Sequence, residues 1–288
     1  MSRTVFLNGE YLPESEAKVS IFDRGFLFAD GVYEVVPVMG GVMVDVEPFL
    51  ARLENSLSEL QLDWPCSRQE YLDMHRELIR ANNLEEGMIY SQVTRGVADR
   101  NFGFPENTPT TLMSFTQVAQ HESNPMAQDG IKVVSVNDIR WKRRDIKSIA
   151  LLAQCLAKQE AREKGAYEGW MVEDGFVTEG TSSTAYIVKD GVIITRPLSN
   201  SVLSGIRRQI MLKLALEHQI RVEERPFTIA EALKADEAMI SAASSVLPIV
   251  ELDGQVIGDG KPGPVFEKMR ALYFENARQN ADKPVVQG

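Results

Sequence analysis

The chain has 288 residues, of which 44% are hydrophobic and 25% are charged. This length exceeds the usual size of one domain, roughly 100–200 residues, so we expect two domains, each with its own apolar core. The formal net charge of -10 argues against nucleic acid as a partner, because neutralising phosphates requires clustered Lys and Arg.

The counts of cysteine and histidine and the lengths of the apolar runs exclude further classes of protein. Two cysteines are too few for a disulfide scaffold, and the three histidines are scattered without zinc-ligand spacing, so we expect no metal site. No run approaches the ~20 apolar residues of a membrane span, and the N-terminus lacks the apolar stretch of a signal peptide. We therefore expect a cytoplasmic protein that does not bind membranes.

The first part of the chain predicts a small N-terminal α/β domain over residues 1–119. Asn8-Gly9 between two apolar runs favours a tight hairpin turn. The expected strands are 4–7, 11–12, 32–38, 42–44, 89–94 and 111–118, and the expected helices run from about 45 to 60 and from 68 to 81. Segment 96–108 is rich in Gly, Pro and Asn and is typical of a functional loop.

A polar linker over residues 120–130 is expected to lead into a larger C-terminal α/β domain over residues 131–288. The expected strands are 131–136, 169–172, 185–188, 192–195 and 238–241, and the expected helices are 149–164 and 205–218, with a helical turn at 231–233. The alternation of short strands and helices predicts a mixed α/β (α+β) fold in two domains.

Lys147 is the first candidate for covalent chemistry. It follows a charged turn and precedes a predicted helix. A lysine amine condenses with an aldehyde only when it is unprotonated, and burial or nearby cations favour that state. Lys142, Arg143 and Arg144 are cationic neighbours in the sequence. The alternative is a solvated lysine at the start of a helix, as most lysines are exposed.

Glu179 stands beside a run of hydroxyl residues that includes Ser182 and Ser183. A carboxylate set against a pyridine nitrogen keeps that nitrogen protonated and strengthens the ring as an electron sink. The hydroxyls could hold a phosphate or a substrate carboxylate. The alternative is a Ser/Thr-rich surface turn.

Further segments offer groups that bind anions. Ser204 or Gly205 can cap a helix whose free N–H groups and dipole attract a phosphate, although an ordinary capped helix has the same pattern. Arg100 in the predicted loop could grip a carboxylate, and Tyr33 on a strand could donate its hydroxyl to a substrate. The alternatives are a surface arginine and a packed tyrosine.

These segments together resemble the fold-type IV (class IV) pyridoxal-phosphate (PLP) aminotransferases, and within them most closely the D-amino-acid (D-alanine) aminotransferases. The resemblance spans nearly the whole chain in one order. It is carried by Asp23-Arg24-Gly25, Asp30-Gly31-Val32-Tyr33-Glu34-Val35-Val36, Gln92-Val93-Thr94-Arg95-Gly96, Asp138-Ile139-Arg140-Trp141, Asp145-Ile146-Lys147-Ser148, Leu156-Ala157-Lys158-Gln159-Glu160-Ala161, Thr178-Glu179-Gly180 and Ser204-Gly205-Ile206.

The resemblance implies a role for each matching residue. Lys147, in the C-terminal domain, would be the Schiff-base lysine and the base for the substrate α-proton, and Glu179 would pair with the pyridine nitrogen. The remaining cofactor contacts would come from Arg52, Leu203, Gly205, Ile206 and Arg207, and the substrate contacts from Tyr33, Arg100, Phe102, Ser182 and Ser183. The family is dimeric with active sites at the subunit interface, so a homodimer is expected.

The chain departs from the D-alanine enzymes at four places. Phe102 stands where their carboxylate trap has histidine, which removes one hydrogen-bond donor and adds an apolar ring. Ala242-Ala243 stands where they have threonines, and Arg207 replaces a smaller residue at the phosphate helix and could supply charge in place of a lost hydroxyl. Thr184 ends the hydroxyl run in place of the usual Asn.

The resemblance implies transfer of an amino group between a D-amino acid, of the D-alanine or D-glutamate type, and a 2-oxo acid such as 2-oxoglutarate or pyruvate. The apolar Phe102 leaves an (R)-selective amine:pyruvate transaminase as the first alternative. Branched-chain L-amino-acid transamination and aminodeoxychorismate lyase activity remain further alternatives within the same fold.

Overall fold

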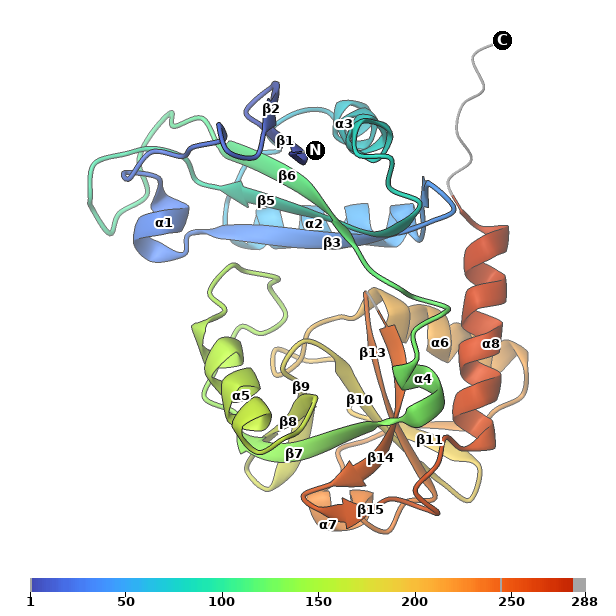
Figure 1. Ribbon diagram of the computed structural model, residues 1–288. Helices are drawn as coiled ribbons and strands as arrows, with labels where there is room; N and C mark the ends of the chain where they lie inside the picture. Colours follow the sequence, from blue (N-terminus) through green and yellow to red (C-terminus); the bar gives the residue numbers. More distant parts are fainter. Residues whose placement is uncertain (1, 244, 282–288) are drawn as a thin grey trace. The chain divides into compact units, whose positions relative to one another are not determined.

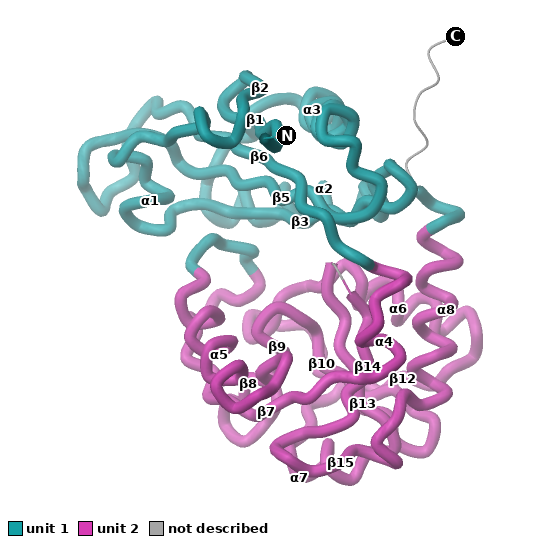
Figure 2. Tube along the Cα trace, viewed as in Figure 1, with its two compact units in different colours: residues 1–120, 146–150, 278–288 teal, residues 121–145, 151–277 magenta. Residues whose placement is uncertain are grey.

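The computed structural model describes residues 2–243 and 245–281, which form two compact units (Figure 2). Unit 1 contains residues 1–120, 146–150 and 278–288, and unit 2 contains residues 121–145 and 151–277. The segment 146–150, called the lysine segment below, therefore packs with the N-terminal unit, which differs from the expectation that residues 131–288 carry Lys147.

Unit 1 is built on a six-stranded antiparallel sheet (Figure 1). In spatial order the strands are β2 (Glu10–Pro13), β1 (Thr4–Leu7), β6 (Thr111–Val118), β5 (Glu86–Thr94), β3 (Gly31–Met39) and β4 (Val42–Met43). Its helices are α1 (Arg24–Phe28), α2 (Val46–Glu59) and α3 (Arg68–Ala81). Asn8 and Gly9 both take positive φ in the β1–β2 turn, as a tight hairpin turn requires.

The two faces of this sheet differ in what covers them. Alternate residues of a strand point to opposite faces. Glu34 of β3 reaches Arg52 of α2, and Ser91 of β5 reaches His75 of α3, so these residues mark the face that the two helices cover. Tyr33, the neighbour of Glu34, therefore points to the opposite face.

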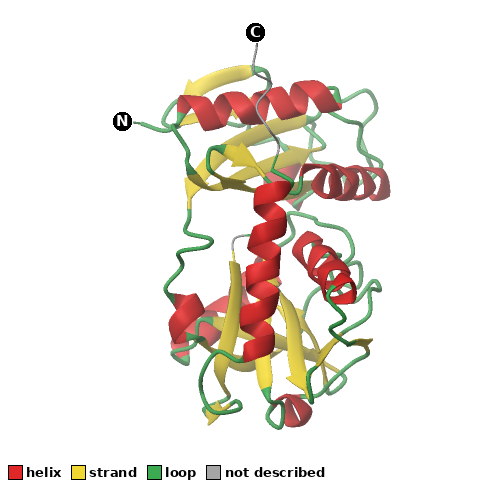
Figure 3. Ribbon diagram, turned by 90° about the vertical axis from the view of Figure 1, so that its right-hand side faces the viewer, coloured by secondary structure: helices red, strands yellow, loops and turns green. Residues whose placement is uncertain are grey.

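Unit 2 is built on a nine-stranded mixed sheet. In spatial order its strands are β12 (Val222–Glu224), β11 (Val192–Thr195), β10 (Thr184–Lys189), β13 (Glu237–Ala242), β14 (Ser245–Leu252), β7 (Ile131–Asn137), β8 (Glu168–Glu173) and β9 (Phe176–Gly180), and β15 (Gln255–Val256) pairs with β14. Its helices are α4 (Met126–Asp129), α5 (Leu152–Glu163), α6 (Ile206–Glu217), α7 (Ile229–Ala232) and α8 (Pro264–Gln279). Figure 3 shows α8 lying lengthwise beside the strands of unit 2.

The predicted mixed α/β fold class is confirmed. The helix expected over 68–81 has those bounds as α3, because Ser67 and Glu70 form a reciprocal capping box at its start. The helix expected over 149–164 begins only at Leu152, after the lysine segment, and the expected linker contains α4. The elements α1, β9, β12, β14, β15 and α8 were not predicted. Among the described residues, no helix is both long and apolar enough to cross a membrane.

Candidate active site

The side chain of Lys147 lies against Tyr33 on the face of the unit 1 sheet opposite α2 and α3. Ser148 forms an antiparallel bridge with Val32, and the Tyr33 N–H donates to the Lys147 carbonyl at 3.0 Å. The Lys147 N–H in turn donates to Ser56 Oγ of α2 at 3.2 Å. These bonds dock the lysine segment on the edge of β3 and place Lys147 Nζ 4.1 Å from the centre of the Tyr33 ring.

Tyr33 is the first ring of an aromatic stack across the sheet. Its ring stacks on Tyr90 of β5 with centroids 5.4 Å apart, and Tyr90 stacks on Phe115 of β6 at 5.0 Å. The Tyr90 hydroxyl donates to Gln92 at 2.9 Å. Tyr90 was not among the predicted site residues, although its place two residues before Gln92 in a strand puts it on the face of the sheet that Tyr33 occupies.

Glu179, the last residue but one of β9, is a buried carboxylate with cationic and backbone partners. Arg140 donates to it through Nη1, and the Leu203 N–H donates to both carboxylate oxygens at 3.2 Å. Asp138 accepts from the other side of the Arg140 guanidinium, at 2.7 Å from Nη2. Burial raises the pKa of the Glu179 carboxyl, while the Arg140 guanidinium opposes the rise. The network fixes the carboxylate in one orientation, and Arg140 is a site residue whose role the sequence did not indicate.

The start of α6 brings the predicted phosphate-binding residues together. Gly205 is the N-cap residue and has an extended conformation. Because glycine has no side chain, it cannot accept a hydrogen bond from the N–H groups of the first turn. Ile206 and Arg207 are the first two residues of the helix. Backbone N–H groups at such an end attract anions. Leu203, three residues earlier, contacts Glu179, so the expected ring-facing and phosphate-facing residues belong to one short stretch.

Arg52, the other predicted phosphate ligand, is engaged within unit 1. Its Nε and Nη2 atoms donate to the two carboxylate oxygens of Glu34 at 2.7 and 2.6 Å. Glu34 is fully buried, so the bidentate pair is strong and fixes the guanidinium on α2. The phosphate role of Arg52 stays a prediction.

The loop after β5 places Arg100 between two aromatic rings. Its Cζ lies 5.4 Å from the centres of both the Phe28 and the Phe102 rings. Phe102, where the D-alanine enzymes have histidine, therefore contacts the predicted carboxylate-binding arginine as a cation–π partner rather than as a donor. Both residues are exposed.

Two buried arginines support this loop from within unit 1. Arg24 Nη1 donates to the Asn101 carbonyl at 2.6 Å, and Arg95 Cζ lies 3.5 Å from the centre of the Phe104 ring. Asp30 accepts from Nε of both arginines at 2.8 Å. The loop is therefore fixed to the sheet by charged groups that have their own counter-ion.

The hydroxyl run after β9 turns toward a buried carboxylate. Thr181 Oγ1 and Ser183 Oγ donate to Glu168 of β8, the latter at 3.1 Å, and Ser182 Oγ lies 3.5 Å from it. Glu168 is 1% exposed. The hydroxyls of this run thus stabilise a buried charge, and the predicted contact of Ser182 and Ser183 with substrate stays a prediction.

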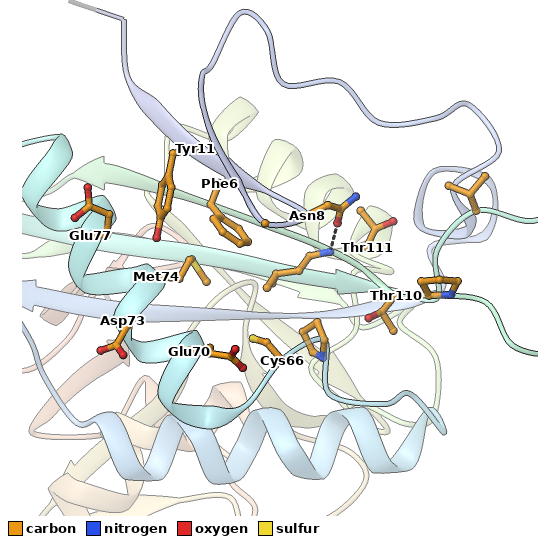
Figure 4. A pocket seen from close by; sticks show the side chains of 15 residues that line it. Phe6, Asn8, Tyr11, Cys66, Glu70, Asp73, Met74, Glu77, Thr110 and Thr111 are labelled. Atoms are coloured by element: carbon orange, nitrogen blue, oxygen red, sulfur yellow. Dashed lines mark hydrogen bonds between the residues drawn. The ribbon is translucent and has the colours of Figure 1, made fainter.

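A cavity of 980 Å³ lies in unit 1, between α3 and the β1–β2 hairpin (Figure 4). Its lining includes Phe6, Tyr11 and Met74, and three carboxylates of α3 stand along one side. Each carboxylate has a partner, since Glu70 accepts from Ser67, Asp73 from Gln69 and Arg76, and Glu77 from Arg80. No predicted site residue lines this cavity among the described residues.

The sequence and the fold are similar to those of known proteins. The chain matches the family Amino-transferase class IV over residues 31–252, and therefore belongs to the class IV aminotransferases. It is 41% identical to the D-alanine aminotransferase of Staphylococcus aureus over 269 residues, which cover 92% of this chain and 95% of that protein.

Two solved structures have the same fold. The branched-chain amino acid aminotransferase of Escherichia coli superposes with a TM-score of 0.89 and 25% identity, over 99% of this chain and 98% of that one. The branched-chain aminotransferase of the archaeon Thermoproteus uzoniensis, solved with norvaline, superposes with a TM-score of 0.86 and 25% identity, over 96% of this chain and 94% of that one. The sequence is thus more similar to the D-alanine enzyme than to either branched-chain enzyme.

Proposed function

We propose that the protein is a PLP-dependent transaminase that moves an amino group between a D-amino acid, of the D-alanine or D-glutamate type, and a 2-oxo acid such as pyruvate or 2-oxoglutarate. The observation that carries the chemistry is the amine of Lys147, docked on the edge of β3 over the Tyr33 ring. The substrate class is supported by the 41% identity to a D-alanine aminotransferase over nearly the whole chain.

The described residues fit PLP in three respects. Lys147 offers an amine for the aldehyde, Glu179 offers a buried carboxylate for the ring nitrogen, and the start of α6 offers N–H groups for the phosphate. The guanidinium of Arg207 beside that helix start is buried and lacks a hydrogen-bond partner among the described residues, which suits an anionic ligand. When bound, PLP supplies a protonated ring that accepts the electrons released when the substrate loses its α-proton.

The protein's own residues then handle the proton and the charge. Lys147 would hold the cofactor through its ε-amine, and its Nζ would take the substrate α-proton and return it. Glu179 would supply a carboxylate for the ring nitrogen, and Arg140 and the Leu203 N–H prevent that carboxylate from turning away. Arg100 and Tyr33 bind the substrate carboxylate.

We also propose that the enzyme works as a homodimer. Large apolar side chains are exposed on and near the loop that bears Arg100. They are Ile21, Phe22, Phe26, Val97, Phe102 and Phe104. An exposed apolar surface of this kind marks a protein–protein interface. Light scattering should give twice the chain mass of 32.2 kDa, and a mass of one chain would contradict the dimer.

The choice of amino donor tests the substrate class. Purified protein with PLP receives D-alanine, D-glutamate, L-leucine, (R)-1-phenylethylamine or aminodeoxychorismate singly, and the released keto product or pyruvate is measured by mass spectrometry. We expect turnover with the two D-amino acids. Turnover with L-leucine or the (R)-amine alone would replace the proposed substrate class, and pyruvate release from aminodeoxychorismate would replace the reaction.

Substitution of Lys147 tests the chemistry. Lys147→Ala should remove the visible absorbance of the lysine-bound cofactor and lower kcat at least ~10³-fold, because both the covalent anchor and the base are lost. Lys132→Ala, at an exposed lysine of β7, is the matched control and should retain both. Unchanged turnover in Lys147→Ala would refute the role of this amine.

A further inference from the structure

Arg207 is a buried cation of unit 2 whose side chain has no hydrogen-bond partner among the described residues. This side chain is 4% exposed, and among residues 2–243 and 245–281 its Nε, Nη1 and Nη2 atoms all lack a hydrogen-bond partner. The next residue, Arg208, is equally buried, but its Nη2 donates to the Arg196 carbonyl and to Glu224. Burial of an arginine in this part of the fold thus does not by itself prevent pairing.

The groups around Arg207 do not neutralise it. Its Cζ lies 4.2 Å from the centre of the Tyr273 ring of α8, which solvates a cation only weakly. Arg270, one helical turn before Tyr273, is a second cation near it. Burial lowers the pKa of Arg270, the Glu122 carboxylate opposes this shift, and the charge of Arg207 adds to it. Two guanidinium groups and the positive end of a helix dipole therefore meet with no carboxylate paired to Arg207 among the described residues.

An uncompensated charge of this kind is stable only with a counter-ion. Arginine stays protonated at all physiological pH values, so it cannot escape the cost of burial by losing its proton. Side chains of a helix lean toward its N-terminus, which brings the guanidinium of the second residue of α6 alongside the N–H groups of the first turn. Both sets of donors are therefore without a protein acceptor among the described residues and suit an anion.

Among the described residues, the end of the neighbouring strand β13 has few hydrogen-bond donors to offer an anion. The hydroxyl of Ser241 at the end of β13 is engaged with Tyr186 at 2.7 Å, and Ala242 and Ala243 follow it with methyl side chains. A charged donor on α6 can take the place of hydroxyl donors on this strand.

We propose that the guanidinium of Arg207 is itself a ligand of the phosphate monoester of the cofactor, acting together with the N–H groups at the start of α6. The inference rests on the proposed function, which supplies the phosphate, and deepens it by giving a direct phosphate contact to the guanidinium, which the sequence comparison only suggested as a source of charge. The competing explanation is a structural one, in which Arg207 only holds α6 against Tyr273 of α8.

Binding to the cofactor-free protein separates these explanations without measuring turnover. Wild type, Arg207→Met and Lys213→Met are titrated with PLP, with pyridoxal, which lacks the phosphate, and with inorganic phosphate, and the readouts are absorbance for the aldehydes and Tm for phosphate. Lys213 is the matched control, because it is an exposed cation of the same helix.

If Arg207 binds the phosphate, wild type should prefer PLP to pyridoxal by a ratio that falls at least tenfold in Arg207→Met and is unchanged in Lys213→Met. Inorganic phosphate should raise the Tm of wild type and of Lys213→Met but not of Arg207→Met. Without any anion, Arg207→Met should be as stable as wild type or more stable, because an unpaired buried charge has been removed.

An unchanged PLP-to-pyridoxal ratio in Arg207→Met would overturn the inference while leaving the proposed function standing. So would a lower Tm of the cofactor-free variant with normal stabilisation by phosphate, which is the signature of a structural arginine. Failure of wild type to form the visible band with either aldehyde would instead overturn the proposed function, and with it this inference.

Discussion

Arg207 of unit 2 differs in its surroundings from two equally buried arginines of unit 1. Arg24 and Arg95 in unit 1 are 3% and 6% exposed, and Arg207 in unit 2 is 4% exposed. Asp30 pairs with both of the first two at 2.8 Å, whereas no described carboxylate pairs with Arg207. The arginines that support the loop have their counter-ion within the chain, whereas the ligand that we propose for Arg207 would supply its counter-ion.

His75 shows why the comparison is informative for arginine in particular. It is fully buried on α3, its Nε2 lies 2.6 Å from Ser91 Oγ, and its Nδ1 lacks a partner among the described residues. Burial lowers the pKa of His75 to about 3, so the ring is simply neutral at pH 7. A histidine can lose its charge in an apolar site, and an arginine cannot.

Removing the shared counter-ion would break the comparison and should have the largest effect. Asp30→Asn leaves Arg24 and Arg95 without a carboxylate, and we expect the free energy of unfolding to fall by about 3–5 kcal/mol. Urea unfolding at pH 7 measures the change. Glu54→Gln, which removes the exposed partner of Arg68, is the control and should cost about 0–1 kcal/mol. Equal losses in the two variants would contradict the importance we assign to Asp30.

The pH dependence of stability should sharpen the contrast with His75. The pKa of His75 is lower in the folded chain than the ordinary value of 6.5. The contribution of the neutral ring to the free energy of unfolding is therefore complete above pH 6.5 and is lost as the pH falls toward 3. Between those values wild type should lose stability by up to about 1.4 kcal/mol per pH unit more than His75→Gln. Urea unfolding at pH 7 and pH 5 compares the slopes. Exposed His218→Gln should leave the slope unaltered, and identical slopes in all three proteins would exclude His75 as the cause.

Arg100 is an intermediate case, since aromatic rings surround its charge. Phe102→Leu removes one ring of the pair that flanks it, and we expect KM for a D-amino acid to rise about 2–5-fold with kcat unchanged, as one exposed cation–π contact is worth about 0.5–1 kcal/mol. Steady-state kinetics with D-alanine measures the split. Phe176→Leu, at an exposed phenylalanine of β9, should alter neither constant. A fall in kcat at constant KM would mean that Phe102 does not act through substrate binding.

Local chemistry explains which parts of the fold could be predicted. The Asn8-Gly9 turn and the Ser67–Glu70 capping box are short-range signals, and the hairpin and α3 appear where those signals place them. The helix α8 also has a signal, because Pro264 begins it and apolar residues recur at helical spacing along it, so it could have been found. The strand β12 pairs with β11, which lies before α6 in the chain, and no local pattern reveals that partner. The strand β9 pairs with the preceding strand β8 across the Asp174-Gly175 turn, which is a local hairpin signal, so β9 could have been found.

The site divides in the same way. Lys147 and Glu179 stand out in the sequence because their residue types suit the chemistry. Arg140 does not, because its contact with Glu179 spans 39 positions and forms only when β9 returns beside the turn after β7. The lack of a hydrogen-bond partner for Arg207 among the described residues is likewise a property of the packed structure, because the sequence does not show which carboxylates lie near it.

The docking of the lysine segment on β3 limits how the chain can be divided into fragments that fold separately. The lysine segment covers the edge of β3, although residues 121–145 between it and the rest of unit 1 belong to unit 2. Residues 1–120 alone would therefore leave the first half of β3 with unpaired N–H and C=O groups. Such an edge recruits other strands and favours aggregation. No single cut therefore yields two well-behaved halves, and a shuffled or truncated version of this enzyme must bring the five residues 146–150 along with the N-terminal sheet.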